Sequence, residues 1–296
     1  MFLPEIELRE AAMRWLDANP SPLVDFAWLT TFEFDGVRIP LIDRVRGIRA
    51  PKELRAALSI RTVHTPDGKN PPYEDSIGPD GLQRYKYQGT DPEAPNNVAL
   101  RRAMHDGLPL IWFVGIAKGQ YQAIYPVHVI HDDQERHEFT LALDASQRDL
   151  KPGAVEPDRR AWVERTTKQR LHQPVFRAQV LLAYRGKCSI CRLKHAELLD
   201  AAHIIADGLP RGNAVVPNGI SLCKIHHAAY DANILGIRPD LTLHVRDDVL
   251  AERDGWMLAG GIQRVHNRSL EILPSSPAQR PDPTRLEERY AHFLMA

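Results

Sequence analysis

The segment of residues 188–231 constrains this chain more than any other, because it concentrates residue types that bind metal ions. It holds all three cysteines of the 296-residue chain, which are Cys188, Cys191 and Cys223. With His226 they supply the four thiolate and imidazole ligands that a closed, structural zinc site requires. His195 is an alternative to His226 as the fourth ligand, although its spacing from Cys191 is less usual. No cysteine is left for a disulfide framework, which favours a reducing compartment.

A second set of polar residues remains once the zinc ligands are assigned. It consists of His203, Asn218 and His227, which are fifteen and nine residues apart. Consecutive side chains on a helix diverge by about 100°. His226 can therefore face the zinc ion while its neighbour His227 faces a different site.

A histidine, an asparagine and a histidine in this order around a zinc knuckle resemble the HNH, or ββα-metal, nuclease fold. The resemblance implies that His203 is the general base, that Asn218 pins the loop that orients it, and that His227 binds a catalytic cation. Asp231, four residues after His227 on the same helical face, matches a further metal ligand of some members. The expected cofactors are structural Zn²⁺ and catalytic Mg²⁺ or another divalent ion such as Mn²⁺, Co²⁺ or Ni²⁺.

One position departs from the HNH pattern. Many HNH enzymes have aspartate or histidine immediately before the general base, where this chain has Ala202. Strand alternation puts Asp200 on the same face as Ala202. We therefore expect Asp200 to replace the usual residue as a ligand of the catalytic ion.

Charge is balanced over the whole chain, with 38 basic and 38 acidic residues, so net charge gives no argument for nucleic acid. The local distribution is more informative, because residues 159–194 contain ten lysines and arginines and one acidic residue, Glu164. A basic surface beside the metal motif suits contact with phosphate groups. The alternative is a solvated amphipathic helix.

The pattern of apolar residues predicts an α+β fold with a β-rich N-terminal half. Short apolar runs predict strands, and 3.6-residue periodicity predicts helices; the strands are expected at 37–42, 82–87, 110–116, 121–130, 138–143, 198–205 and 241–245, and the helices at 7–18, 97–105, 159–184 (interrupted near Pro174) and 283–295. A Pro- and Gly-containing stretch at 151–158 is the expected linker between domains 1–150 and 159–296.

Short motifs in the N-terminal half resemble the SRA domain, a barrel related to PUA folds that flips a modified cytosine out of duplex DNA. In chain order these motifs are Gly47-Ile48-x-x-Pro51, Tyr73-Glu74-Asp75, Tyr85-x-Tyr87-Gln88-Gly89 and Tyr121-x-x-x-Tyr125-x-Val127. A flipped base requires aromatic faces for stacking and polar groups for its Watson–Crick edge. The resemblance implies a modified-base pocket with stacking residues Tyr73 and Tyr87, Asp75 on the cytosine amino group, and Gln88 where eukaryotic readers have threonine. The alternative is that these tyrosines pack inside an ordinary β-barrel.

Together the two resemblances predict a modification-dependent restriction endonuclease of the SRA–HNH type. Its expected partner is double-stranded DNA containing 5-methylcytosine or 5-hydroxymethylcytosine, and the resemblance also implies a homodimer. Two rivals remain: an HNH endonuclease with another DNA target, and a non-catalytic zinc-containing nucleic-acid-binding protein. No membrane partner is expected, because the longest apolar run, 108–117, is too short to span a bilayer. The N-terminus lacks the features of a signal peptide, so a cytoplasmic location is expected.

Overall fold

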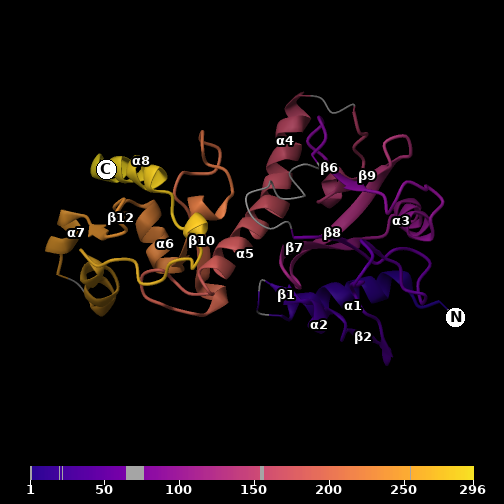
Figure 1. The fold of residues 1–296 in the computed structure, drawn as a ribbon, viewed down its shortest axis with the longest axis horizontal. Helices are drawn as coiled ribbons and strands as arrows, with labels where there is room; N and C mark the ends of the chain where they lie inside the picture. Colours follow the sequence, from indigo (N-terminus) through magenta and orange to yellow (C-terminus); the bar gives the residue numbers. More distant parts are fainter. Residues whose placement is uncertain (1, 20, 22, 65–76, 154–156, 254) are drawn as a thin grey trace. The chain divides into compact units, whose positions relative to one another are not determined.

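The computed structural model describes all residues except 1, 20, 22, 65–76, 154–156 and 254 (Figure 1). The chain forms two compact units, residues 1–175 and 176–296, and each is described by itself. The expected division at 151–158 concerns functional domains and stays a prediction. Among the described residues, no helix has both the length and the apolar character needed to cross a bilayer.

The first unit mixes helices with a large sheet, in agreement with the α+β prediction. Its elements in chain order are α1 (Glu5–Asp17), β1 (Val24–Asp25), α2 (Phe26–Leu29), β2 (Glu33–Phe34), β3 (Val37–Arg38), β4 (Ile48–Arg49), β5 (Ser59–Thr62), β6 (Gln83–Lys86), α3 (Pro95–His105), β7 (Leu110–Ala117), β8 (Gln120–Asp133), β9 (Glu138–Ala142) and α4 (Pro157–Thr167). A π-helical turn, Lys168–His172, joins α4 to α5 (Gln173–Ala183), which continues into the second unit. The interruption expected near Pro174 is therefore present just before that proline.

The main sheet has seven strands, in the order β4-β5-β7-β8-β9-β6 with β1 beside β8. The sheet curls, so that Tyr85 on β6 reaches the far edge. The Tyr85 hydroxyl donates toward two carbonyl oxygens there, that of Gly47 at 2.9 Å and that of Arg61 at 3.0 Å. A Cβ at Gly47 would lie 2.8 Å from the Tyr85 hydroxyl, so the close approach requires glycine there. Backbone pairing between the end strands β4 and β6 is absent among the described residues. The prediction of a β-rich half is thus met, whereas the expected SRA barrel is not established.

Helix α1 covers one face of this sheet (Figure 1). Its buried side chains Leu8, Ala12 and Leu16 recur at helical spacing and pack in one core with Ile111 and Phe113 of β7. The same periodicity predicted a helix at 7–18 from the sequence, and that helix is confirmed.

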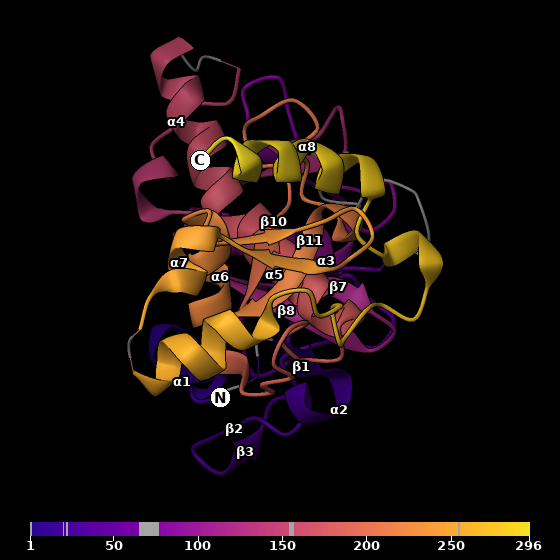
Figure 2. The same cartoon turned by 90° about the vertical axis from the view of Figure 1, so that its left-hand side faces the viewer.

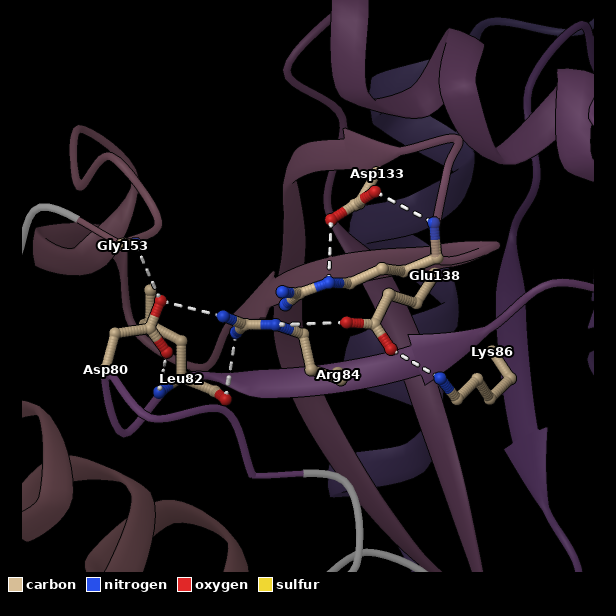
Figure 3. A network of polar contacts seen from close by, with 8 residues as sticks. Asp80, Leu82, Arg84, Lys86, Asp133, Glu138 and Gly153 are labelled. Carbon is tan, nitrogen blue, oxygen red and sulfur yellow. Dashed lines mark hydrogen bonds and ion pairs between the residues drawn. The ribbon is translucent and has the colours of Figure 1, made fainter.

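A polar network stabilises the edge of the sheet formed by β6 and its neighbour β9 (Figure 3). Arg84 on β6 lies between Asp80, at 2.7 Å, and Glu138 of β9, at 3.7 Å. Glu138 also pairs with Lys86 at 2.5 Å, and Asp80 accepts a hydrogen bond from the backbone N–H of Gly153. The side chains of Arg84 and Asp80 are largely buried, so loss of one partner would leave a charge uncompensated.

The second unit is a small α+β assembly around one apolar core (Figure 2). Its elements in chain order, after α5, are β10 (Leu199–His203), β11 (Gly219–Cys223), α6 (Lys224–Asp231), β12 (Leu235–Ile237), β13 (Leu243–Val245), α7 (Asp247–Ala251), a π-helical turn (Met257–Ile262) and α8 (Pro283–Leu294). Strands β10 and β11 pair antiparallel and lead directly into α6. The expected strand within 198–205 and the closing helix at 283–295 are confirmed.

One local expectation was wrong in detail, and several short strands were missed. The strand expected at 37–42 is limited to Val37–Arg38, since Pro40 follows and cannot donate to a ladder. β4, β5 and β12 were not anticipated, because two- to four-residue strands are too short to show alternation.

Candidate active site and metal centre

Three cysteines and one histidine converge to form a candidate metal centre in the second unit. The ligand atoms of Cys188, Cys191, Cys223 and His226 all lie within 4.8 Å of one another. His226 Nδ1 is 3.5 Å from the sulfur of Cys188 and 3.2 Å from that of Cys223. This donor set, three thiols and one imidazole, suits a tetrahedral structural zinc ion. The His195 alternative is not part of the cluster.

The surroundings of His226 support the same assignment. Its Nε2 lies 2.9 Å from the Gly261 carbonyl oxygen, an acceptor that places a proton on Nε2 and leaves Nδ1 for a metal. Hydrogen bonds with Cys188 and then Cys191 lower the pKa of the Cys223 thiol and favour a thiolate. Burial lowers the pKa of His226, but hydrogen bonds with Cys188 and Cys223 outweigh it and raise that pKa to about 10. The electrostatics of the cluster thus favour a bound cation.

His203 ends β10, opposite Gly219 at the start of β11. Its ring stacks on Phe176 of α5 with a centroid distance of 4.1 Å. A Cβ at Gly219 would lie 2.8 Å from the Phe176 ring and 2.5 Å from Val180, so glycine is needed for α5 to pack this closely. The hairpin and α5 together therefore fix the imidazole of His203.

Asn218 is fully buried, and its side chain fastens the loop that follows His203. Its Oδ1 accepts a hydrogen bond from Ile205 N at 2.9 Å, and its Nδ2 donates to Ile205 O at 3.0 Å and Asn213 O at 3.1 Å. The backbone N–H of Ile204 donates to Asn218 O. These bonds hold both ends of the loop together, which is the geometry that a loop-pinning role requires.

His227 lies on α6 between two carboxylates. Its Nδ1 is 3.4 Å from Asp200 Oδ2, and its Nε2 is 3.3 Å from Asp231 Oδ2. The side chain of Asp200 also accepts a hydrogen bond from Lys224 at 2.7 Å and lies 3.8 Å from Arg177. The two carboxylates therefore contact opposite nitrogens of one ring.

The environment of Asp200 differs from that of Asp231. Burial raises the pKa of the Asp200 carboxyl, but hydrogen bonds from Lys224 and His227 outweigh burial and lower that pKa below its ordinary value. Asp231 is exposed on the last turn of α6. Ala202, the departure from the HNH pattern, is buried in the apolar core. An acid at position 202 would enter that core, so this strand lacks the usual ligand beside the base.

His203 and His227 open onto one cavity of about 500 Å³. Its wall includes Asp231 and the loop from Ile204 to Leu209, together with residues of the closing helix: Glu288, Arg289 and His292. Two imidazoles and an exposed carboxylate thus face a shared space. That arrangement can bind an anionic ester near a cation and an activated water.

The expected base pocket is only partly within the described residues. Tyr73 and Asp75 lie outside them. Tyr87 is buried, its ring packs against Phe139 at 4.7 Å, and its hydroxyl donates to Asp132. Burial and then Asp132 raise the pKa of Tyr87 to about 12. Gln88 is exposed and accepts a hydrogen bond from Asn96 through its side chain.

Several residues that shape the site had no signal in the sequence. Phe176, the Gly261 carbonyl and the residues of α8 reach the two centres from segments outside the motif. A stacking phenylalanine or a backbone carbonyl follows no ligand spacing, so only the three-dimensional packing identifies them.

Comparison with known proteins supports the nuclease interpretation of this segment. Residues 188–238 match the family model described as HNH endonuclease, which confirms the HNH prediction for that part of the chain. No curated protein matches the chain. Among solved structures, the modification-dependent TagI restriction endonuclease aligns at 16% identity and TM-score 0.31, over 80% of this chain and 82% of its own. The type IV phosphorothioation-dependent restriction endonuclease ScoMcrA aligns at 16% identity and TM-score 0.21, over 63% of this chain and 48% of its own.

Proposed function

We propose that this protein is a modification-dependent DNA endonuclease. Its second unit hydrolyses phosphodiester bonds, and its first unit reads 5-methylcytosine or 5-hydroxymethylcytosine in double-stranded DNA. The observation that carries the nuclease part is the cavity shared by His203 and His227 within the segment that matches HNH endonucleases. The reading of modified cytosine is supported by the SRA-like motifs of the first unit.

His203 is the proposed general base. It accepts a proton from water, the water oxygen bonds to phosphorus, and the bond from phosphorus to the departing deoxyribose oxygen breaks. Asn218 keeps the loop after His203 in place, and the stacked ring of Phe176 limits rotation of the imidazole. Each of these residues acts by fixing where the proton acceptor lies.

His227 and Asp231 are the proposed ligands of a catalytic Mg²⁺ or similar divalent ion, because Nε2 and Oδ2 lie 3.3 Å apart at the cavity wall. When bound, such an ion would stabilise negative charge on the phosphoryl group. Asp200, expected from the sequence as a ligand, contacts Nδ1 of the same ring. We therefore assign it the role of orienting His227, as carboxylates commonly do for metal-binding histidines.

The remaining parts of the proposal concern assembly and location. One HNH site cuts one strand at a time, so a homodimer would supply the second site for a double-strand break. A cytoplasmic location fits cysteines that serve as thiolate ligands. Sedimentation of the purified protein with and without DNA tests the dimer.

The decisive experiment is digestion of matched plasmids that carry cytosine, 5-methylcytosine or 5-hydroxymethylcytosine, with Mg²⁺, Mn²⁺, Co²⁺ or Ni²⁺. We expect cleavage of the modified plasmids only, and its loss in His203→Ala with folding and zinc content unchanged. If the wild-type protein cuts no plasmid with any of these ions, the result would support a non-catalytic binding protein instead.

A second function, an HNH endonuclease with a different DNA target, is favoured by one observation. Tyr87 is buried against Phe139 with its hydroxyl occupied, which is how a packing tyrosine behaves. Equal cleavage of modified and unmodified plasmids would select this function. Cleavage with a tenfold or larger preference for modified DNA would reject it.

A further inference from the structure

The closing helix α8 forms part of the active-site wall, although it lies outside the segment that matches HNH endonucleases. The match ends at residue 238, and α8 spans Pro283–Leu294. Asp282 N donates to Pro217 O at 3.0 Å, and Arg285 donates to the side chain of Asn213 at 2.8 Å. These bonds tie the start of α8 to the loop that Asn218 pins.

The apolar side of α8 fixes how the helix is rotated. Leu286 and Phe293 are buried in the second unit, and the Phe293 ring lies so close to Gly236 of β12 that an added Cβ would be 2.7 Å from it. Glu288 and His292 then point away from the apolar side and line the cavity. Arg289 also lines the cavity, but it lies on the same face as Leu286 and Phe293. Spacing of four residues places Glu288 and His292 on one helical face.

Two of these three side chains already have protein partners. Arg289 donates to Asn233 Oδ1 at 2.6 Å and to Tyr230 O at 2.5 Å, and it lies over the Tyr230 ring. Glu288 pairs with Arg211 at 3.4 Å. By contrast, the imidazole of His292 has no hydrogen-bond partner among the residues that the structure describes, and it is exposed at the cavity.

We propose that His292 contacts the phosphodiester substrate, donating a hydrogen bond from its imidazole to a phosphate oxygen. The inference rests on the proposed nuclease function and deepens it, since it adds a substrate contact from outside the HNH segment. The cavity wall also includes the acidic residues Asp207, Asp231 and Glu288, and the guanidinium of Arg289 is already bound to Asn233 and Tyr230. An imidazole N–H without a protein partner is suited to hold a phosphate oxygen in such a site. His203 remains the proton acceptor, and His292 takes no part in breaking the bond.

The test compares His292→Ala, His292→Gln and Glu287→Ala in the full-length protein. Glu287 lies on α8, is exposed and does not line the cavity, so its variant is a matched control. Nicking of supercoiled plasmid gives kcat and KM at several Mn²⁺ concentrations. In a His203→Ala background, fluorescence anisotropy gives the affinity for a labelled duplex.

We expect His292→Ala to lower kcat/KM 10- to 100-fold and duplex affinity at least threefold, with partial recovery in His292→Gln. Glu287→Ala should stay within twofold of wild type. The half-saturating Mn²⁺ concentration and the zinc content should not change.

Three results would overturn the inference. The first is a duplex affinity of His292→Ala within twofold of its background. The second is a tenfold shift in the Mn²⁺ requirement, which would make His292 a metal ligand, and the third is an equal loss of thermal stability in both His292 variants. A wild type that binds DNA but never nicks it would defeat the proposed function instead. The affinity measurement would then decide the role of His292 by itself.

Discussion

The side-chain amide of Asn218 makes two hydrogen bonds to the backbone of Ile205, one to the N–H at 2.9 Å and one to the carbonyl at 3.0 Å. Ile205 is two residues after His203, and Asn218 directly precedes the strand that pairs with it. One buried amide thus couples the backbone just after His203 to the start of β11. We therefore expect Asn218 to fix the position of His203 and to take no part in proton transfer.

Replacement of Asn218 by alanine should disable the enzyme without removing a reacting group. Buried backbone groups of Ile205 would lose their partners, at a cost of about 1–3 kcal/mol in the free energy of unfolding. We expect kcat to fall by at least tenfold with little change in duplex affinity. Urea unfolding and plasmid nicking measure the two effects, and unchanged kcat would contradict the positioning role.

Removal of the proposed zinc ion should unfold the second unit rather than simply inhibit it. The cluster of Cys188, Cys191, Cys223 and His226 joins the Cys188–Cys191 turn to the junction of β11 and α6, and folding of small zinc domains depends on the metal. Cys223→Ala should lower zinc content to near zero and abolish nicking. Metal analysis with circular dichroism checks this outcome, and a zinc-free protein that retains full nicking would refute it.

Asp200 and Asp231 should respond differently to neutralisation. Asp231→Asn removes a proposed ligand, so the divalent ion needed for half-maximal activity should rise at least tenfold. Asp200→Asn removes the bond that orients His227, so kcat should fall while the ion requirement changes less. Titration of Mn²⁺ against nicking rate separates the two, and a reversed ranking would make Asp200 the ligand.

The Arg84 network should stabilise the first unit. Arg84→Ala leaves the buried Asp80 and the half-paired Glu138 without their guanidinium partner. Breaking a buried pair in this way costs about 3 kcal/mol. Thermal unfolding should show the loss, whereas Arg136→Ala, which removes an exposed partner of Asp133, should change the midpoint little.

Acid should weaken the first unit through His128. Burial and then the nearby Arg148 lower the pKa of this histidine to about 4. Between that value and the ordinary pKa of about 6.5, the unfolded chain binds a proton that the folded chain does not. Stability therefore falls as pH drops through this window, by about 1–2 kcal/mol at pH 5. His128→Gln should flatten the difference between urea unfolding at pH 7.5 and pH 5, and an unchanged slope would show that other groups cause it.

The sequence by itself determined the local features of this protein. Cys188-x-x-Cys191 and Cys223-x-x-His226 predicted the candidate metal cluster, because ligand spacing within a knuckle and a helical turn is set by short-range geometry. The periodicity of Leu8, Ala12 and Leu16 predicted α1 for the same reason.

Only the tertiary structure decided what lies around those features. Three contacts join residues that lie tens of positions apart in the chain, and their spacing does not encode which atoms meet. They are the stacking of Phe176 on His203, the contact of Asp200 with Nδ1 of His227, and the place of His292 at the cavity. Burial of Tyr87 against Phe139 likewise depends on how the sheet curls. Such contacts arise when apolar faces pack and bring distant segments together, and no local pattern records which segments will meet.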